Sequence, residues 1–364
     1  MAIPLTDVRA QYAPLLDELK DRIVAVLDSG SFILGPEVKA FEEEAARFLG
    51  VGDAVGVANG TDALVIVLDA LGVGPGDEVV CPSFTFYATA ESIARRGGTP
   101  VFADIDPATL NLDPADVAAK MTERTKAILP VHLFGRPCDP AALPDRVPVV
   151  EDAAQAFGAK VGDRRAGSLA AAATFSFYPT KNLFGLGDGG LVTTADSELT
   201  DRIRLLRFHG SRDKLTFDAV GYNSRLDELQ AAALRIFLRH VEEWNEGRRA
   251  AAARYAELGL GDVCELPADE PGHVYHMYVV RTEARERITA ALAADEIACA
   301  AYYVTPLHLQ PAMAYLGYRP GSLPETERAA AENLALPMWG GLDGDRQARV
   351  VSTVRAAAGV PVRA

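Results

Sequence analysis

AATFSFYPTKNLFGLGDGGLVTT, residues 172–194, places a lysine and a glycine-rich turn between two short apolar runs. The runs at 172–177 and 190–194 are continuous rather than alternating, which is typical of strands covered by helices on both faces. Lys181 lies four residues after the end of the first run. A lysine between apolar β-structure and a mobile turn can lose its proton, and a neutral amine is a nucleophile. The stretch therefore predicts an interior strand that leads into a reactive lysine.

Five further apolar runs precede this stretch, and helical patterns separate most of them. The runs lie at 54–58, 78–81, 99–103, 126–130 and 147–151, and the helical patterns at 61–71, 85–95, 114–121 and, after the lysine, 197–208. This alternation predicts an α/β fold with a mostly parallel, seven-stranded sheet flanked by helices. The helix at 61–71 is apolar nearly all round, so we expect it to lie centrally.

The last third of the chain has a different pattern. Residues 224–258 are helical in pattern, with Gly247 interrupting them, and are suited to link two domains. A strand at 273–280, a helix at 284–294, a strand at 298–304 and a helix at 343–357 follow. We therefore expect a large domain over residues 1–240 and a smaller α+β domain over residues 241–364, with the N-terminal segment a candidate to pack on the smaller one.

Composition narrows the functional classes. The 364 residues carry a net charge of -14, which disfavours non-specific nucleic-acid binding, because that mode needs clustered Lys and Arg. No apolar run approaches the roughly 20 residues that span a bilayer, and the N-terminus lacks the pattern of a signal peptide. We expect a soluble, cytoplasmic protein that binds neither nucleic acid nor membrane. The four cysteines are far apart, which argues against structural zinc and a disulfide framework.

Ala58-Asn59-Gly60-Thr61 is a candidate phosphate site. A short strand ends here and an apolar helix begins, so free N–H groups and a hydroxyl face the positive end of a helix dipole. The alternative is that Thr61 only caps the helix.

Acidic and aromatic residues end two other predicted strands. Glu151 and Asp152 close an apolar run, and a buried carboxylate there needs a cation or several donors; a surface loop acid is the alternative. Residues 81–90 bring aromatics to a second strand-to-helix junction, where a ring could stack on a flat ligand or simply pack in the core. An aspartate near a reactive lysine is suited to pair with a pyridinium nitrogen.

Two other sequence patterns concern a dinucleotide site and a metal site. Residues 185–190 match GxGxxG, but a dinucleotide fingerprint must follow a strand and open a helix, whereas this run follows a lysine-bearing turn and enters a strand. A flexible hairpin-like turn is the plain alternative. His273 and His276 are three apart, which would put them on opposite faces of a strand, and the other histidines show no ligand spacing, so we predict no catalytic metal.

Taken in order, these segments resemble the DegT/DnrJ/EryC1/StrS family of nucleotide-sugar aminotransferases, which are pyridoxal-phosphate enzymes of fold type I. The resemblance covers nearly the whole chain, from Ser31-Phe32-Ile33-Leu34-Gly35-Pro36 through residues 302–310 to Leu336-Pro337-Met338. It implies pyridoxal 5'-phosphate as cofactor, with pyridoxamine 5'-phosphate as its intermediate form. It also implies a homodimer with shared active sites.

The resemblance gives roles to residues at matching positions. Lys181 would be the Schiff-base lysine and Asp152 the partner of the pyridine nitrogen. The other implied cofactor contacts are Gly60, Thr61 and Ser176 on the phosphate, Phe86 on the ring, Gln155 and Tyr178 near the 3-hydroxyl, and Asn223 and Arg225 from the neighbouring subunit. Tyr178 stands where some members have His. The implied substrate contacts are Phe32, His308, Arg212 and Tyr303; for a sugar carboxylate or diphosphate the candidates are Arg212, Arg225 and Arg319.

The implied reaction moves an amino group from L-glutamate to a keto sugar carried by UDP or dTDP, for glycan, O-antigen or secondary-metabolite biosynthesis. Lys181 would shuttle the proton in both halves of the reaction. Its presence disfavours the related sugar 3-dehydrases, which have His at that place. A 3-keto sugar is favoured, and a 4-keto sugar is the alternative. A non-catalytic regulatory protein on the same fold is more remote, because it would have no need of Lys181, Asp152 and Thr61 together.

Overall fold

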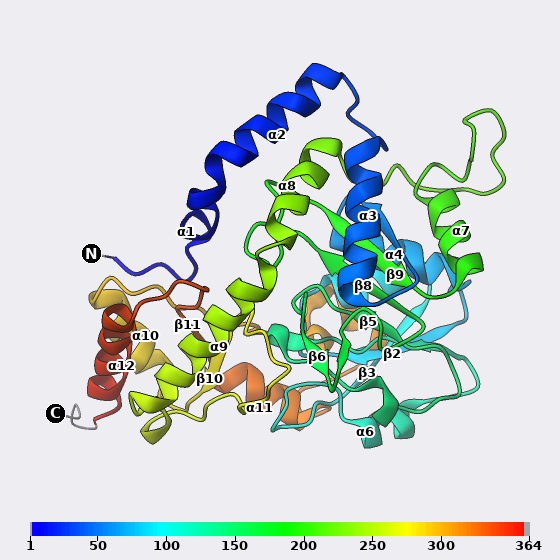
Figure 1. Ribbon diagram of the computed structural model, residues 1–364. Coiled ribbons are helices and arrows are strands. Elements are labelled where there is room, and N and C mark those ends of the chain that lie inside the picture. Colours follow the sequence, from blue (N-terminus) through cyan, green and yellow to red (C-terminus); the bar gives the residue numbers. More distant parts are fainter. Residues whose placement is uncertain (1, 360–364) are drawn as a thin grey trace.

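Seven strands lie side by side in the computed structural model, which describes residues 2–359 (Figure 1). Four pair in the order β1 (Asp53–Val57), β9 (Gly190–Thr194), β8 (Ala172–Ser176) and β5 (Val150–Asp152). Three pair in the order β3 (Thr99–Ala103), β2 (Glu78–Pro82) and β4 (Thr125–Ile128). Isolated parallel bridges, Ile128 with Val149 and Val131 with Asp152, join the two groups. The predicted α/β fold is confirmed.

Strand direction decides where the strand ends meet. β9 is antiparallel to both β1 and β8, so β1 and β8 run the same way. The remaining pairs are parallel. The carboxyl ends of β1, β2, β5 and β8 therefore open on one edge of the sheet, where α/β proteins usually bind ligands. β8 and β9 form a hairpin around Lys181, which excludes the dinucleotide interpretation of residues 185–190.

Helices cover both faces of this sheet. One hydrophobic cluster joins β8 to α3 (Pro36–Leu49) and α8 (Glu228–Leu238). A second joins β1 and β2 to α4 (Gly60–Ala70), α5 (Ala88–Arg95) and α7 (Ser197–Leu206). The side chains of residues 63–68 in α4 are all buried, which confirms its predicted central place. A third cluster packs β2 and β3 against α6 (Pro114–Lys120).

The helical stretch predicted from residue 224 to 258 is two helices. α8 ends at Leu238 and α9 (Val241–Glu257) begins after Arg239 and His240. The prediction that Gly247 interrupts the helix is wrong: Gly247 lies inside α9. A Cβ at Gly247 would lie 2.1 Å from the carbonyl oxygen of Gly340, so this glycine allows close packing of two backbones.

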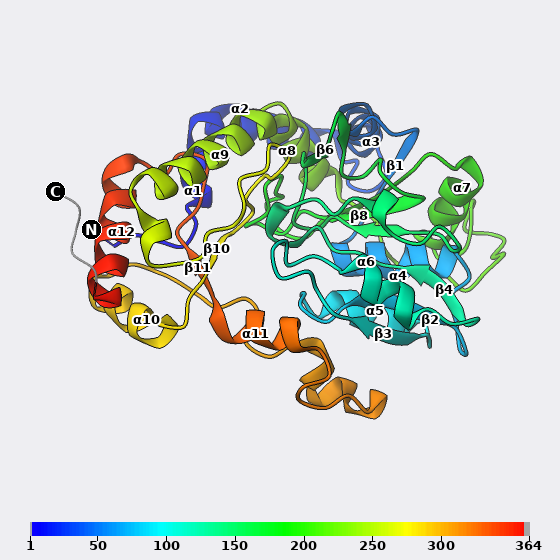
Figure 2. The same cartoon turned by 90° about the horizontal axis from the view of Figure 1, so that it is seen from below.

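The C-terminal unit has its own core (Figure 2). α9 packs there with α10 (Arg285–Ala294), α12 (Gly344–Ala358) and the antiparallel pair β10 (Tyr278–Arg281) and β11 (Asn333–Leu336). Ile3 belongs to this core and forms a bridge with Ile297, so the N-terminal segment does pack here. The domain boundary between residues 240 and 241 stays a prediction, and residues 360–364 lie outside the described part.

Two strand predictions in this unit need correction. Only residues 278–280 of the predicted strand 273–280 belong to a strand, β10, because residues 273–277 are irregular and Val274 and Met277 donate their backbone N–H groups to Gly135 and Phe134 instead. The predicted strand 298–304 is reduced to a single bridge, Ala300 with Ala335. α11 (Pro324–Glu332) precedes β11 and was not predicted.

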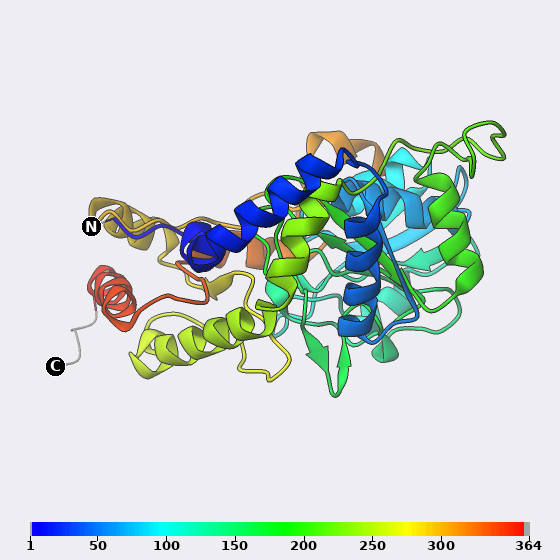
Figure 3. The same cartoon turned by 45° about the horizontal axis from the view of Figure 1, so that its top comes forward.

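Shorter elements complete the described chain. At the N-terminus, α2 (Leu16–Ser29) lies along α8 (Figure 3). The others are α1 (Val8–Tyr12), the hairpin β6 (Lys160–Val161) and β7 (Arg164–Arg165), and 3-10 turns at Ala13–Leu15, Leu133–Gly135, Pro140–Ala142, Leu260–Asp262, Leu307–Leu309 and Pro311–Leu316. Across residues 2–359, no helix has the length and apolar character required to cross a membrane.

Candidate functional site

Asp152 and Lys181 meet at the carboxyl edge of the sheet because their strands are parallel neighbours. Asp152 is the last residue of β5 and pairs with Thr174 of β8, and Lys181 lies in the turn that follows β8. The lysine amine and the aspartate carboxylate are close enough for their charges to interact. The sequence therefore placed both residues correctly at one edge.

The Asp152 carboxylate is buried and held by two donors. Thr89 donates its hydroxyl to Oδ2 at 2.8 Å, and the N–H of Ala154 donates to Oδ1 at 3.3 Å. Burial raises the pKa of Asp152, while these hydrogen bonds and the Lys181 charge act in the opposite direction. A further cation at this carboxylate would offset more of the burial cost. The site is thus suited to a ligand that carries a positive charge on a ring nitrogen.

Lys181 has the properties of a nucleophilic amine. Burial lowers its pKa from 10.5 to about 8, and the Asp152 carboxylate opposes that shift. Its backbone N–H donates to the carbonyl of Tyr178 at 2.9 Å, which closes the turn after β8. At pH 7 roughly a tenth of such a lysine is neutral, roughly 300 times more than for an ordinary lysine.

Because only the neutral amine attacks an aldehyde, we expect the capture of pyridoxal phosphate by the apoprotein to depend on pH. The rate should rise about tenfold per unit below the Lys181 pKa of about 8 and level off above it. Stopped-flow recording of the visible absorption between pH 6 and 10 measures this. A rate that keeps rising to a midpoint near 10.5 would contradict it.

The residues predicted to bind a phosphate lie where β1 leads into α4. Asn59 caps this helix, because its side-chain oxygen accepts the N–H of Asp62 at 2.8 Å. The alternative in which Thr61 is the cap is therefore wrong, and its hydroxyl is not used for capping. Gly60 packs against Ser176: a Cβ at Gly60 would lie 2.7 Å from the Ser176 Cβ. The Ser176 side chain thus lies beside the N-terminus of α4, where free backbone N–H groups favour an anion such as phosphate.

Aromatic and amide groups line the same edge. Gln155 is buried: its Oε1 accepts the N–H of Phe134 at 2.7 Å and its Nε2 donates to the Tyr303 hydroxyl at 3.2 Å. The Phe86 ring is 6.3 Å from the Tyr303 ring and 59% exposed, so one face is free to cover a flat ligand. Tyr178 is also exposed, and the structure gives it no bond to Gln155.

The other predicted residues differ in burial. His308 is buried: Nδ1 is 2.7 Å from the Ser83 hydroxyl and Nε2 is 3.1 Å from Glu327. Both ring nitrogens are thus engaged within the protein, and the geometry does not support a substrate contact. The remaining residues are exposed or half-buried: Phe32, Arg212, Arg319, Asn223 and Arg225.

Three buried residues have contacts that the sequence did not predict. Thr89 lies four residues after Thr85, and their hydroxyls are 3.1 Å apart, a spacing that the sequence did contain. His276 is buried near Lys181, whose charge helps burial to lower the histidine's pKa. Glu151 points away from Asp152, and its carboxylate accepts the His132 ring N–H at 2.8 Å and three backbone N–H groups of residues 167–170.

His273 and His276 are not on opposite faces of a strand, because both precede β10. The His273 ring stacks on Tyr275 with centroids 3.8 Å apart. Within residues 2–359, no cluster of three or more His, Cys, Asp or Glu side chains is arranged to hold a metal ion.

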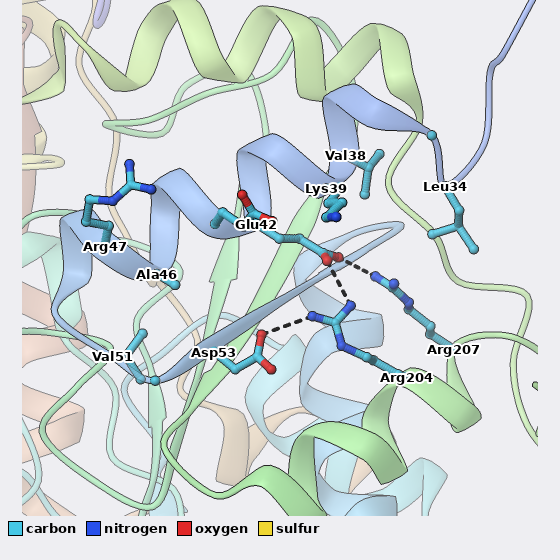
Figure 4. Close-up of a pocket in the computed structure, with 13 residues that line it drawn as sticks. Leu34, Val38, Lys39, Glu42, Ala46, Arg47, Val51, Asp53, Arg204 and Arg207 are labelled. Atoms are coloured by element: carbon cyan, nitrogen blue, oxygen red, sulfur yellow. Dashed lines mark hydrogen bonds and ion pairs between the residues drawn. The ribbon is translucent and has the colours of Figure 1, made fainter.

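A hollow of about 730 Å³ is a different feature (Figure 4). It is lined by α3, β1 and α7. Glu42 points at two arginines, and its carboxylate is 2.8 Å from Arg204 and 2.5 Å from Arg207; Asp53 is 3.0 Å from Arg204. These charges are paired with one another, and the catalytic candidates do not line the hollow.

The donor set at the sheet edge fits pyridoxal phosphate. Lys181 would supply the amine for its aldehyde, Asp152 the carboxylate for its ring nitrogen, and the Gly60–Thr61 helix start with Ser176 the donors for its phosphate.

Comparison with known proteins supports this assignment. The model of the DegT/DnrJ/EryC1/StrS aminotransferase family matches residues 15–355. The chain is 47% identical to a pleiotropic regulatory protein of Geobacillus stearothermophilus, over 97% of this chain and 98% of that one. It is 45% identical to the UDP-N-acetyl-3-dehydro-alpha-D-glucosamine 3-aminotransferase of Acidithiobacillus ferrooxidans, over 97% of each chain.

A solved structure gives the same result for the fold. The crystal structure of Streptomyces venezuelae DesV, in complex with a ketimine intermediate, superposes with a TM-score of 0.95 at 44% identity. The match covers 98% of each chain, so the fold agrees from end to end.

Proposed function

Because this chain belongs to the DegT/DnrJ/EryC1/StrS aminotransferase family, and is therefore a pyridoxal-phosphate-dependent aminotransferase, we propose that it aminates a keto sugar carried by a nucleotide. The observation that carries the proposal is the meeting of Lys181, whose pKa is lowered to about 8, with buried Asp152 at one sheet edge. A protein that only binds or regulates has no need of this pair.

Each residue has a distinct task in the proposed reaction. When bound, the cofactor supplies a protonated ring that stabilises negative charge at a substrate carbon. Asp152 keeps the proton on the ring nitrogen, and Thr89 and Ala154 orient its carboxylate. Lys181 holds the aldehyde and, once released, moves a proton between the substrate carbon and the carbon of the former aldehyde. Gly60, Thr61 and Ser176 bind the phosphate.

Gln155, Tyr178 and Phe86 orient the ring in this proposal. Hydrogen bonds to Phe134 and Tyr303 fix Gln155, which supports a contact with the 3-hydroxyl, and the exposure of Phe86 supports a role in covering one ring face. Tyr178 is exposed beside the turn that carries Lys181, and in this proposal its side chain contacts the bound cofactor.

A 3-keto sugar on UDP or dTDP is the proposed acceptor, with L-glutamate as donor. The Acidithiobacillus ferrooxidans relative, at 45% identity, carries a name that specifies a UDP-linked 3-dehydro sugar. A 4-keto nucleotide sugar is the alternative within the family.

We also propose a cytoplasmic homodimer in which residues 221–225 reach the partner's site. The loop that precedes this segment projects beyond α7 (Figures 1 and 3). On this loop the side chains of Leu215 and Val220 are 85% and 94% exposed. Apolar side chains exposed to this degree on a protruding loop favour burial by another subunit. Light scattering after size exclusion tests the dimer.

The substrate proposal is tested with a panel of UDP- and dTDP-linked 3-keto and 4-keto sugars, with glutamate as donor. We expect 2-oxoglutarate release with a 3-keto member, and little with the others. Release only with a 4-keto sugar would establish the alternative. Failure to release 2-oxoglutarate with any member, by a protein that holds the cofactor, would favour the non-catalytic interpretation, for which the relative named as a regulatory protein is the precedent.

A further inference from the structure

Tyr222 lies at the centre of a polar cluster between two helix ends. Its hydroxyl donates to Oδ2 of Asp69, in the last turn of α4, at 2.7 Å, and accepts from Nη1 of Arg96, at the end of α5, at 3.0 Å. Burial, together with the Asp69 carboxylate, raises the pKa of Tyr222 to about 12. The hydroxyl therefore keeps its proton at neutral pH and remains a donor to Asp69.

A second hydrogen bond holds residues 222–224 at the opposite, N-terminal end of α4. The Ser224 hydroxyl accepts the N–H of Ala58 at 3.1 Å, immediately before the Gly60–Thr61 phosphate site. The N–H of Ser224 donates to the carbonyl of Arg207 at 3.1 Å, and the N–H of Tyr222 donates to Leu206 at 2.7 Å. Residues 222–224 are therefore held by hydrogen bonds at both ends of α4.

Side chains alternate along this segment. Ser224 is fully buried and Tyr222 half-buried, whereas Asn223 between them is exposed. Arg225 lies beside Asn223, bonds to its side-chain oxygen and sits 5.6 Å from the Phe208 ring. In an extended segment, neighbouring residues point to opposite faces. The inward residues thus anchor the segment and fix where the outward pair is presented.

We propose that Tyr222 is a positioning residue that acts on the cofactor site of the partner subunit and not on that of its own chain. The inference rests on the proposed homodimer, in which Asn223 and Arg225 reach the neighbouring site. Loss of the hydroxyl leaves Asp69 and Arg96 paired with each other at 3.0 Å, so α4 keeps its support. Residues 221–225, in contrast, lose the hydrogen bonds of the Tyr222 hydroxyl to Asp69 and Arg96, next to Asn223.

The test uses hybrid dimers made from two differently tagged subunits. One subunit carries Lys181→Ala, so the visible absorption of lysine-linked pyridoxal phosphate reports only on the other subunit's site. In the trans hybrid, Tyr222→Phe is on the Lys181→Ala subunit. In the cis hybrid, it is on the subunit whose Lys181 is intact. Titration with pyridoxal phosphate then gives the affinity of one defined site.

We expect the trans hybrid to bind pyridoxal phosphate about tenfold more weakly than the hybrid without Tyr222→Phe, and the cis hybrid to match that reference. Equal weakening in both hybrids, weakening only in cis, or no change in either would overturn the inference. A purely structural role of the tyrosine would not distinguish cis from trans.

Two further variants complete the experiment. Tyr255→Phe removes another buried hydroxyl, which donates to the carbonyl of Pro337 at 2.8 Å, and should change neither hybrid. Asp69→Asn weakens the same cluster but keeps the tyrosine, and it should show the trans pattern even if Tyr222→Phe fails to fold. A chain that stays monomeric with its cofactor bound would overturn the dimer and this inference together; a dimer with a normal trans hybrid would overturn the inference alone.

Discussion

Replacement of Lys181 by alanine is expected to reduce both half-reactions by about 10⁴-fold or more. Positioned proton transfer alone contributes about 10²- to 10⁴-fold, and this residue is also the amine that holds the cofactor. The first half is measured as 2-oxoglutarate formed from glutamate in a single turnover. The second is measured as amino sugar formed from protein preloaded with pyridoxamine phosphate.

A matched control separates loss of the amine from loss of charge. Lys160→Ala removes a surface lysine that lies 3.6 Å from Glu242, and it should keep full activity. A small primary amine added to Lys181→Ala should restore part of the proton transfer, because the space left by the side chain admits it. Borohydride should fix the cofactor irreversibly on the wild-type protein and not on the variant. Activity retained by Lys181→Ala would refute the proposed role.

Asp152→Asn is expected to slow transamination by about 10²- to 10³-fold while the protein stays folded. Removal of one partner from a buried ion pair costs about 3–5 kcal/mol, and asparagine cannot hold the proton on the ring nitrogen. A second readout is independent of turnover. Since Asp152 raises the pKa of Lys181, the midpoint of cofactor capture should fall below its wild-type value of about 8.

Glu151→Gln is the matched control for this variant, because it changes the adjacent carboxylate. Glu151 accepts from His132 and from the N–H groups of Gly167, Leu169 and Ala170 at 2.8–3.0 Å, outside the cofactor site. We expect a loss of about 3 kcal/mol in the free energy of unfolding and a nearly unchanged turnover number for the folded fraction. Urea unfolding with activity per folded molecule checks both. If the two variants have the same effect, the assignment of Asp152 fails.

The strands and the chemistry at their ends could be predicted because both are local. Continuous apolar runs identified the seven strands, and turn residues marked where each strand ended. A parallel sheet then brings those ends to one edge, so Asp152 and Lys181 could be paired without a structure.

Features that depend on contacts distant in sequence were missed. Gly247 was interpreted as an interruption because glycine disfavours helices, but the close approach of Gly340 outweighs that preference. The predicted strand 298–304 has strand-forming residues but only one bridge to β11. The resemblance implied a substrate contact for His308, but the fold places its ring between Ser83 and Glu327.

The sequence by itself determined the α/β class and placed Lys181 and the pair Glu151 and Asp152 at strand ends, because these follow from periodicity and turn residues; the roles proposed for Lys181 and Asp152 came from the family resemblance. Only the tertiary structure decided which carboxylate faces the site, that Asn59 rather than Thr61 caps α4, and that Thr89 holds Asp152. Successive strand residues point to opposite faces, and the neighbours on each face come from distant parts of the chain. For the same reason the sequence did not indicate the role proposed for Tyr222, because its partners Asp69 and Arg96 are more than a hundred residues away.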